Sequence, residues 1–230
     1  MMSEHILSAF DRDLEAVQAL VVKMGGLVEE QILESARALE VRDLELAEQI
    51  RARDRAVDEL EEKINEEAAR LIALRAPAAR DLRMALSVIK ISASLERVGD
   101  YAKNIAKRTQ VLSDGPQISG TATAIRRMAG TTEAMLKDAL DAYIQRDPKL
   151  AADVRERDLE VDQMYNALFR EFLTYMMEDP RNITPCMHLH FIAKNIERMG
   201  DHATTIAEQV IYLVTGEMPE DARPKSSSVV

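Results

Sequence analysis

The sequence predicts an all-α fold: a tandem duplication of a three-helix bundle, with six long antiparallel helices in total. Ala, Leu, Glu, Arg and Met are abundant among the 230 residues, whereas Trp is absent and aromatic residues make up only 4%. This composition favours helices, because strands are enriched in aromatic and β-branched residues. Apolar residues also recur at helical spacing through almost the whole chain.

Few residues interrupt this helical pattern, and they divide the chain into six segments. The interruptions are Pro77, the Ser-Asp-Gly-Pro stretch at 113–116, Pro148, the stretch 180–185, and the Arg-Asp turns at 42–43 and 146–147. We therefore predict helices over residues 4–41, 43–74, 79–112, 118–146, 148–177 and 183–215. Segments of about 30 residues exceed the globular average of roughly 11 to 12, which favours long bundles over a mixed domain.

The second half of the chain repeats motifs of the first half. The motif Arg-Asp-x-x-Val-Asp at 53–58 returns at 157–162, 104 positions later, and the Arg-Asp pair at 42–43 returns with the same offset. The segment LERVGD at 95–100 returns as IERMGD at 196–201, 101 positions later. A duplicated unit that has lost three residues in one turn explains both offsets. We predict domains at 1–114 and 115–216, followed by a disordered tail at 217–230.

Each copy carries two pairs of acidic residues spaced four positions apart, beside the apolar stripe of their helix. At 100° per residue these acids lie roughly 100° to 140° from a core residue such as Leu95. Carboxylate pairs that converge from neighbouring helices repel one another unless a cation lies between them. Oxygen ligands suit a hard metal ion, and Gly99 and Gly200 leave room for one. The predicted metal ligands are Asp54, Asp58, Glu96, Asp100, Asn104, Asp158, Asp162, Glu197 and Asp201.

A simpler interpretation of these acids stays open. A single acidic pair on a charged helix is usually a solvated face, and nearby arginines could neutralise it without any metal. The candidate partners are Arg53, Arg97, Arg157 and Arg198. Four pairs at duplicated positions favour the metal hypothesis over this alternative.

Composition and missing motifs exclude several classes of function. The net charge of −10 disfavours nucleic acid and anionic lipid as partners. Cys186 is the single cysteine, which indicates a reducing compartment, and no segment has the roughly 18 apolar residues of a membrane span. We therefore expect a cytoplasmic protein without membrane insertion. No P-loop, dinucleotide-binding, HExxH or ExxH motif is present, so we do not expect an enzyme.

The most specific segments are ERVGDYAKNIA at 96–106 and ERMGDHATTIA at 197–207. They resemble the paired signatures of the PhoU family of phosphate-transport regulators, and the length, the duplication and the Arg-Asp-x-x-Val-Asp segments match as well. The resemblance implies tandem three-helix bundles that hold metal at their surface through E/DxxxD motifs. Iron or zinc is the expected metal, with magnesium or manganese as alternatives. Thr205 stands where the first copy has Asn104, so equal metal occupancy of the two copies is not expected.

The resemblance also implies a role and partners. PhoU proteins are negative regulators of the phosphate-starvation response and of phosphate uptake, and they link the ATPase subunit of a phosphate ABC transporter to a phosphate-sensing histidine kinase. A metal-dependent enzyme and a plain helical scaffold are the alternatives. We also predict a homodimer, because a bundle of three helices leaves apolar flanks that a second copy can cover.

Overall fold

The computed structural model describes residues 2–75 and 79–219, and this part of the chain forms six long α-helices and no strand. The elements are α1 Met2–Val41, α2 Leu44–Arg75, α3 Arg80–Leu112, α4 Thr121–Gln145, α5 Pro148–Glu178, the short 3-10 helix η1 Pro180–Asn182, and α6 Ile183–Thr215. The all-α fold class is confirmed. The largest error in the predicted bounds is at α4, which starts late because Gly120, with φ of 81°, closes a turn in the left-handed region.

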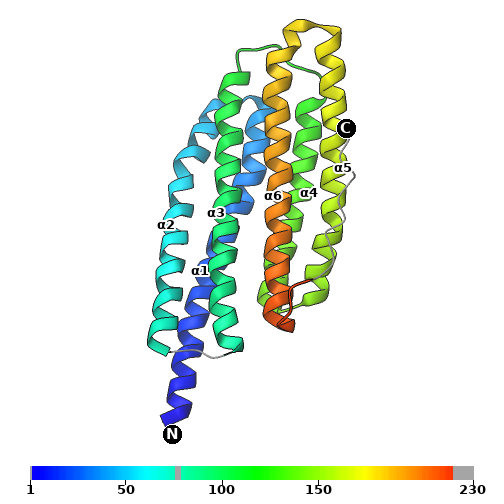
Figure 1. Ribbon diagram of the computed structural model, residues 1–230. Helices are drawn as coiled ribbons and strands as arrows, with labels where there is room; N and C mark the ends of the chain where they lie inside the picture. The colour runs from blue at the N-terminus through cyan, green and yellow to red at the C-terminus, as the bar shows by residue number, and fades with distance from the viewer. Residues whose placement is uncertain (1, 76–78, 220–230) are drawn as a thin grey trace.

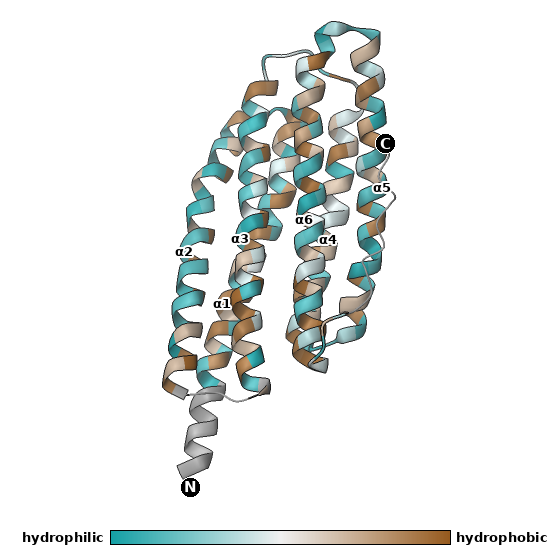
Figure 2. Cartoon of the chain, viewed as in Figure 1, coloured by the Kyte–Doolittle hydropathy of each residue, from teal (hydrophilic) through white to brown (hydrophobic). Residues whose placement is uncertain are grey.

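The six helices form two groups of three that lie against each other (Figure 1). Helices α1, α2 and α3 pack together, as do α4, α5 and α6, while α3 contacts α6 and α1 contacts α4 across the middle. Buried apolar residues from all six helices belong to one continuous core, and Figure 2 shows polar and apolar residues alternating around each helix. The domain bounds at 114 and 216 stay a prediction, and residues 220–230 of the predicted tail lie outside the described residues.

Asp147 and Pro148 start helix α5 as the sequence predicts. The Asp147 carboxylate accepts hydrogen bonds from the backbone N–H groups of Lys149 at 2.8 Å and Leu150 at 3.2 Å. These are two of the N–H groups that have no partner within the helix, so the contact stabilises its first turn. Pro148 occupies the first turn, where its missing N–H costs nothing.

The duplicated Arg-Asp pairs form the same turn in both copies. Arg42 and Arg146 adopt the left-handed conformation, with φ of 54° and 55°. Asp43 then accepts a hydrogen bond from the N–H of Leu46 at 2.9 Å, as Asp147 does at the start of α5. The repeated motif therefore corresponds to a repeated local structure.

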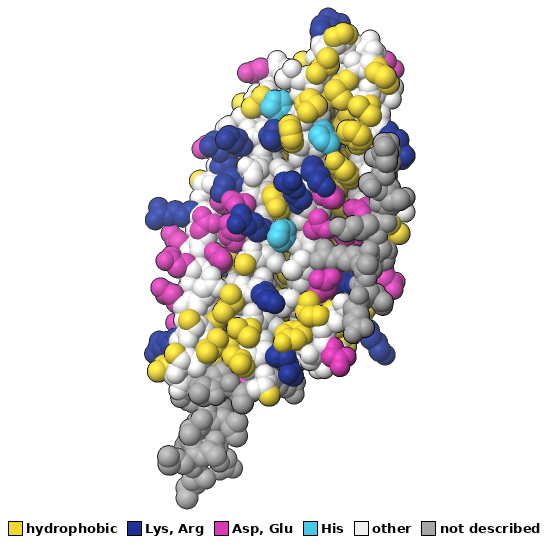
Figure 3. All heavy atoms as spheres, viewed as in Figure 1, with side chains coloured by type: hydrophobic (Ala, Val, Ile, Leu, Met, Phe, Trp, Pro, Cys, Tyr) yellow, Lys and Arg dark blue, Asp and Glu magenta, His cyan; other side chains and the backbone are white. Residues whose placement is uncertain are grey.

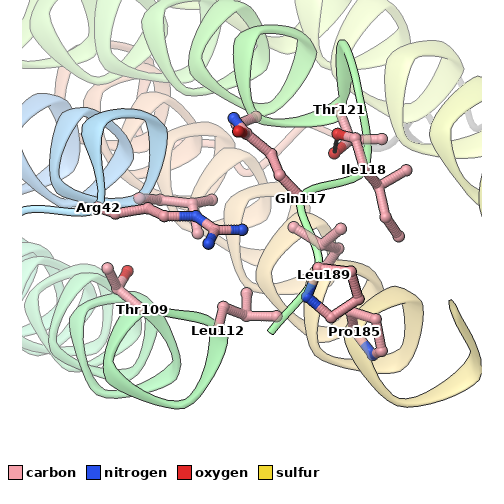
Figure 4. A pocket seen from close by; sticks show the side chains of 11 residues that line it. Arg42, Thr109, Leu112, Gln117, Ile118, Thr121, Pro185 and Leu189 are labelled. Carbon is pink, nitrogen blue, oxygen red and sulfur yellow. Dashed lines mark hydrogen bonds between the residues drawn. The ribbon is translucent and has the colours of Figure 1, made fainter. Parts of the chain in front are cut away.

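Arg42 also ties the α1–α2 turn to the end of α3. Its Nη1 donates to the carbonyl oxygens of Ser113 and Gly115, each at 3.0 Å. Beside these bonds lies a small cavity of about 30 Å³ (Figure 4). Since a cavity of this size holds only a water molecule or two, we assign it a packing role. The residues labelled around it are Arg42, Thr109, Leu112, Gln117, Ile118, Thr121, Pro185 and Leu189.

Matching positions of the two copies meet where α3 packs against α6. Tyr101 and His202 occupy equivalent places in the duplicated signature, and their ring centroids are 5.8 Å apart. Figure 1 shows α3 and α6 side by side and running in opposite directions. The two acidic signatures are therefore brought to the middle of the molecule, each facing the second helix of its own copy.

Candidate functional site

In the first copy, the acidic residues gather where α2 lies against α3. Asp54 on α2 is only 3% exposed, although its side chain is charged at neutral pH when free in water. A Cβ atom at Gly99 on α3 would lie 3.5 Å from Asp54 Oδ1 and 3.3 Å from Val57 Cγ1. The missing side chain at Gly99 thus allows α2 to lie close to α3 and brings Asp54 beside the Glu96–Asp100 pair.

A lysine lies between the carboxylates of the two helices. Lys103 Nζ donates to Asp54 on α2 and, at 2.7 Å, to Asp100 Oδ1 on α3. Burial lowers the pKa of Lys103, but hydrogen bonds to Asp100 and Asp54 and the charges of both acids outweigh it and raise this pKa overall. Lys103 therefore remains charged and neutralises part of the acidic group.

The acids of this group are not all neutralised. Burial, and after it the neighbouring charge of Asp100, raise the pKa of Glu96 to about 7. Arg97 opposes this shift, with its Nε 3.5 Å from Glu96 Oε2. Burial also raises the pKa of Asp54, against the lowering effect of Lys103, and Asp58 and Asp100 add to the increase. The four acids thus interact electrostatically, and the group favours an added positive charge.

The second copy repeats this arrangement between α5 and α6. Asp158 is 3% exposed, and a Cβ atom at Gly200 would lie only 3.0 Å from its Oδ1. Burial raises the pKa of Glu197, and the charges of Asp201 and Asp162 raise it further, while Lys194 lowers it. The glycine contact and the coupled carboxylates are therefore common to both copies.

The cations differ between the copies. Thr204 stands at the position that matches Lys103, and Lys194 stands where the first copy has Ala93. Lys194 Nζ lies 2.6 Å from Glu197 Oε1 and 5.1 Å from the centre of the Tyr165 ring. The lysine of the first copy thus joins two helices, whereas Lys194 pairs with a carboxylate of its own helix.

Asn104 has other surroundings than the eight predicted carboxylates, although it lies one turn after Asp100 on α3. The eight predicted carboxylates form the two groups described above, but Asn104 is exposed and lines a groove with Lys107 and Arg108. Among the candidate arginine partners, Arg97 contacts Glu96 and Asp100, while two others pair elsewhere. Those two are Arg53, with Glu30 and Glu34, and Arg157, with Asp138 and Asp153.

Sequence reasoning missed the two lysines and Gln31. The spacing of three residues between Asp100 and Lys103, and between Lys194 and Glu197, is a known signal for ion pairs on a helix. Gln31 had no such signal, because α1 brings it to Gly99 only in the folded structure. Its Oε1 would lie 3.3 Å from a Cβ atom at Gly99.

Two observations bear on whether a metal ion fits here. Within the described ranges, no three His, Cys, Asp or Glu side chains are already arranged to hold one ion. However, Gln31 Oε1 and Glu197 Oε2 are buried acceptors without a hydrogen-bond donor, and such atoms favour a cation. The donor set therefore suits an oxygen-ligated ion, once the side chains close around it and Lys103 leaves Asp54. The metal site and its ligands stay a prediction.

Known proteins are similar in sequence to this chain over most of its length. The family model described as PhoU domain matches residues 21–109 and again 125–210, one match in each copy. The chain belongs to the PhoU family. The resemblance of the two signature segments is thereby confirmed.

Individual PhoU relatives and structures match almost from end to end. The "Phosphate-specific transport system accessory protein PhoU homolog" of Rhizobium meliloti is 48% identical over 98% of this chain and 95% of its own length, and that of Caulobacter vibrioides is 48% identical over 97% of both. The crystal structure of PhoU from Pseudomonas aeruginosa has a TM-score of 0.87 at 40% identity, covering 90% of this chain and 100% of that one. The PhoU structure from Streptococcus pneumoniae has a TM-score of 0.84 at 30% identity.

Within residues 2–75 and 79–219, no helix is both long and apolar enough to cross a membrane.

The close glycine contact predicts that replacing glycine by alanine has opposite effects on stability at Gly200, which makes this contact, and at Gly26, which does not. Gly26→Ala should stabilise the protein by about 0.5 to 1 kcal/mol, because nothing lies within 4 Å of the new Cβ and alanine favours the helix. Gly200→Ala should destabilise it by roughly 1 kcal/mol or more, because the Cβ meets the buried Asp158 carboxylate. Urea unfolding measures both changes. Equal stabilisation by the two variants would contradict the close contact.

The pKa of Glu96 predicts a pH dependence of stability. Its folded-state pKa of about 7 lies above the ordinary value of 4.5, so the folded protein holds the proton more tightly than the unfolded chain. The free energy of unfolding should therefore fall as pH rises between these values. Glu96→Gln should make this fall smaller, whereas Glu62→Gln, at an exposed position, should leave it unchanged.

Urea unfolding in EDTA, from about pH 5 to about pH 8, tests this expectation. The chelator removes metal, whose binding would add its own pH dependence. The same pH dependence in the wild type and in Glu96→Gln would show that Glu96 titrates normally.

Proposed function

We propose that this protein is an accessory protein of a phosphate-specific transport system that negatively regulates phosphate uptake and the phosphate-starvation response. The observation that carries the proposal is the match, over 97–98% of the chain, with relatives named as phosphate-specific transport system accessory proteins. In this proposal the protein binds the ATPase subunit of the phosphate ABC transporter and a phosphate-sensing histidine kinase in the cytoplasm.

Regulation by binding, without catalysis, is part of the proposal. A protein that acts only by binding shifts a partner between two states, so its affinity for those states has to differ. The surface offers exposed apolar side chains on several helices, including Val111 at 55% and Met177 at 79% exposure. Such residues support contacts with the transporter, the kinase or a second copy in a homodimer.

We further propose that each acidic group holds metal, with iron or zinc expected and magnesium or manganese as alternatives. When bound, the ion would supply positive charge between the two helices of a copy. In the first copy the ligands would be Asp54, Asp58, Glu96 and Asp100, and in the second copy Asp158, Asp162, Glu197 and Asp201. Lys103 competes for Asp54 and Asp100, so we expect tighter metal binding in the second copy.

The metal proposal predicts a loss of bound metal when the α3 and α6 acids are removed. The variant Glu96→Ala, Asp100→Ala, Glu197→Ala, Asp201→Ala should lose metal by plasma mass spectrometry, because half of the carboxylates of each group are gone. The melting temperature of the metal-free protein should change little or rise, because these acids flank the core. Lys103→Met should raise the metal affinity of the first copy, because it removes the competing ammonium group.

A matched variant controls for the change in overall charge. It replaces four exposed acids outside the two groups, and it should keep its metal. These residues are Glu62, Glu66, Glu160 and Glu178. Unchanged metal stoichiometry in the site variant would contradict the proposal.

The regulatory proposal predicts the phenotype of a deletion strain. Without this protein, a phosphate-starvation promoter should stay active in excess phosphate, because nothing holds the kinase in its inactive state. A reporter for that promoter and the rate of phosphate uptake are the measurements. Normal repression of the promoter together with a normal rate of phosphate uptake would contradict the proposed regulatory function.

A further inference from the structure

A groove beside the acidic groups is lined by basic side chains. Asn104, Lys107, Arg108 and Val111 of α3 and His188 of α6 surround a volume of about 290 Å³. Figure 3 shows Lys and Arg side chains over α3 and α6, between Asp and Glu side chains on either side. Positive charge is therefore concentrated along this seam, although the whole chain has a net charge of −10.

The cations of the groove have no carboxylate partner in the described part of the chain. Other cations form ion pairs, such as Arg126 with Glu40 and Arg53 with Glu34. Neither Lys107 nor Arg108 forms such a pair with a described residue, and no acid lines the groove. Two adjacent cations repel each other, so an anion between them would stabilise the site.

Arg108 is held in place by neighbouring rings. Its guanidinium lies 4.5 Å from the centre of the Phe191 ring, and its Nη1 lies 3.2 Å from His188 Nδ1. Because arginine has no acceptor, Nδ1 accepts this hydrogen bond, and the neutral ring carries its proton on Nε2. The groove thus offers N–H donors from Arg108, Lys107, the Asn104 amide and His188, with the arginine already oriented.

The duplication supplies a second groove of the same kind for comparison. It has a volume of about 350 Å³ and includes Ser87 and Gln209, which match His188 and Arg108. Glu208 stands at the position that matches Lys107. The fold therefore forms this hollow at both matching places, but the second hollow has a single cation, Lys90, and lacks the adjacent pair of Lys107 and Arg108. The basic residues are not a requirement of the packing.

We propose that this groove binds a tetrahedral oxyanion of the phosphate class, through Arg108 and Lys107 with Asn104 and His188 as further donors. A guanidinium donates two parallel hydrogen bonds to such an anion, and the ammonium of Lys107 adds a point charge. The volume is at the lower end for small-molecule sites, which favours a single phosphate or phosphoryl group over a nucleotide. The inference goes beyond the proposed function, because it assigns a ligand to residues outside the acidic groups.

Binding to the purified full-length protein tests the proposal. We expect inorganic phosphate to bind saturably, as measured by equilibrium dialysis with radiolabelled phosphate in EDTA. Arg108→Gln, which installs the residue of the second copy, should weaken binding by about tenfold or more, as expected for loss of a charged hydrogen-bond donor. Lys107→Ala with Arg108→Ala should abolish it.

A charge-matched variant separates the groove from the overall charge of the protein. Lys23→Ala with Arg127→Ala removes two exposed cations elsewhere and should leave phosphate binding unchanged. An equal loss in this control would overturn the proposal, because binding would then depend on net charge alone. Circular dichroism checks that Arg108→Gln, the milder variant, remains folded.

A phosphoserine peptide identifies the source of the phosphoryl group. Binding of inorganic phosphate, lost in Arg108→Gln, supports a site for the free anion. Binding of the peptide alone, also lost in Arg108→Gln, supports the site with a phosphorylated partner as its ligand. If the wild-type protein binds neither probe, the groove is not an oxyanion site.

Discussion

The close contact of a buried aspartate with a helix glycine organises both halves of this molecule. Asp54 lies beside Gly99, and Asp158 beside Gly200, in each case with the aspartate almost fully buried. A buried carboxylate is costly unless hydrogen bonds or opposite charges compensate it. The contact brings two helices together and also buries a carboxylate, which favours a positive charge at the same place in both copies.

The two copies supply this positive charge from different residues, although their backbones repeat. In the first copy the ammonium of Lys103 bridges α2 and α3, and in the second Lys194 pairs with Glu197 within α6. In the proposed metal site, stability and metal affinity are therefore opposed at Lys103, since a lysine that neutralises the carboxylates also occupies them. The basic groove shows the same principle, because Gln209 and Glu208 stand in the second copy where the first copy has Arg108 and Lys107. Duplication preserved the packing while the charges diverged.

Much of the fold and part of the site could be predicted from residue patterns. Helical periodicity and the Arg-Asp turns located all six helices, because both signals are local in the chain. The spacing of the acids relative to core residues such as Leu95 placed them correctly beside the core. Asn104 was placed with the acids by its spacing of four residues from Asp100, and the structure adds that it lines the basic groove. Helical spacing gives the angle around an axis, but not which neighbouring helix occupies that side.

The sequence by itself determined the secondary structure, the duplication and the family of this protein, because these depend on the order and spacing of residues along the chain. The tertiary structure decided which charges meet. Only the packing of α2 on α3 places Lys103 between Asp54 and Asp100, and only the packing of α3 on α6 brings His188 to Arg108. Lys103 and Asp54 are 49 residues apart in the chain, and Arg108 and His188 are 80 residues apart. No local sequence pattern could therefore specify these two contacts.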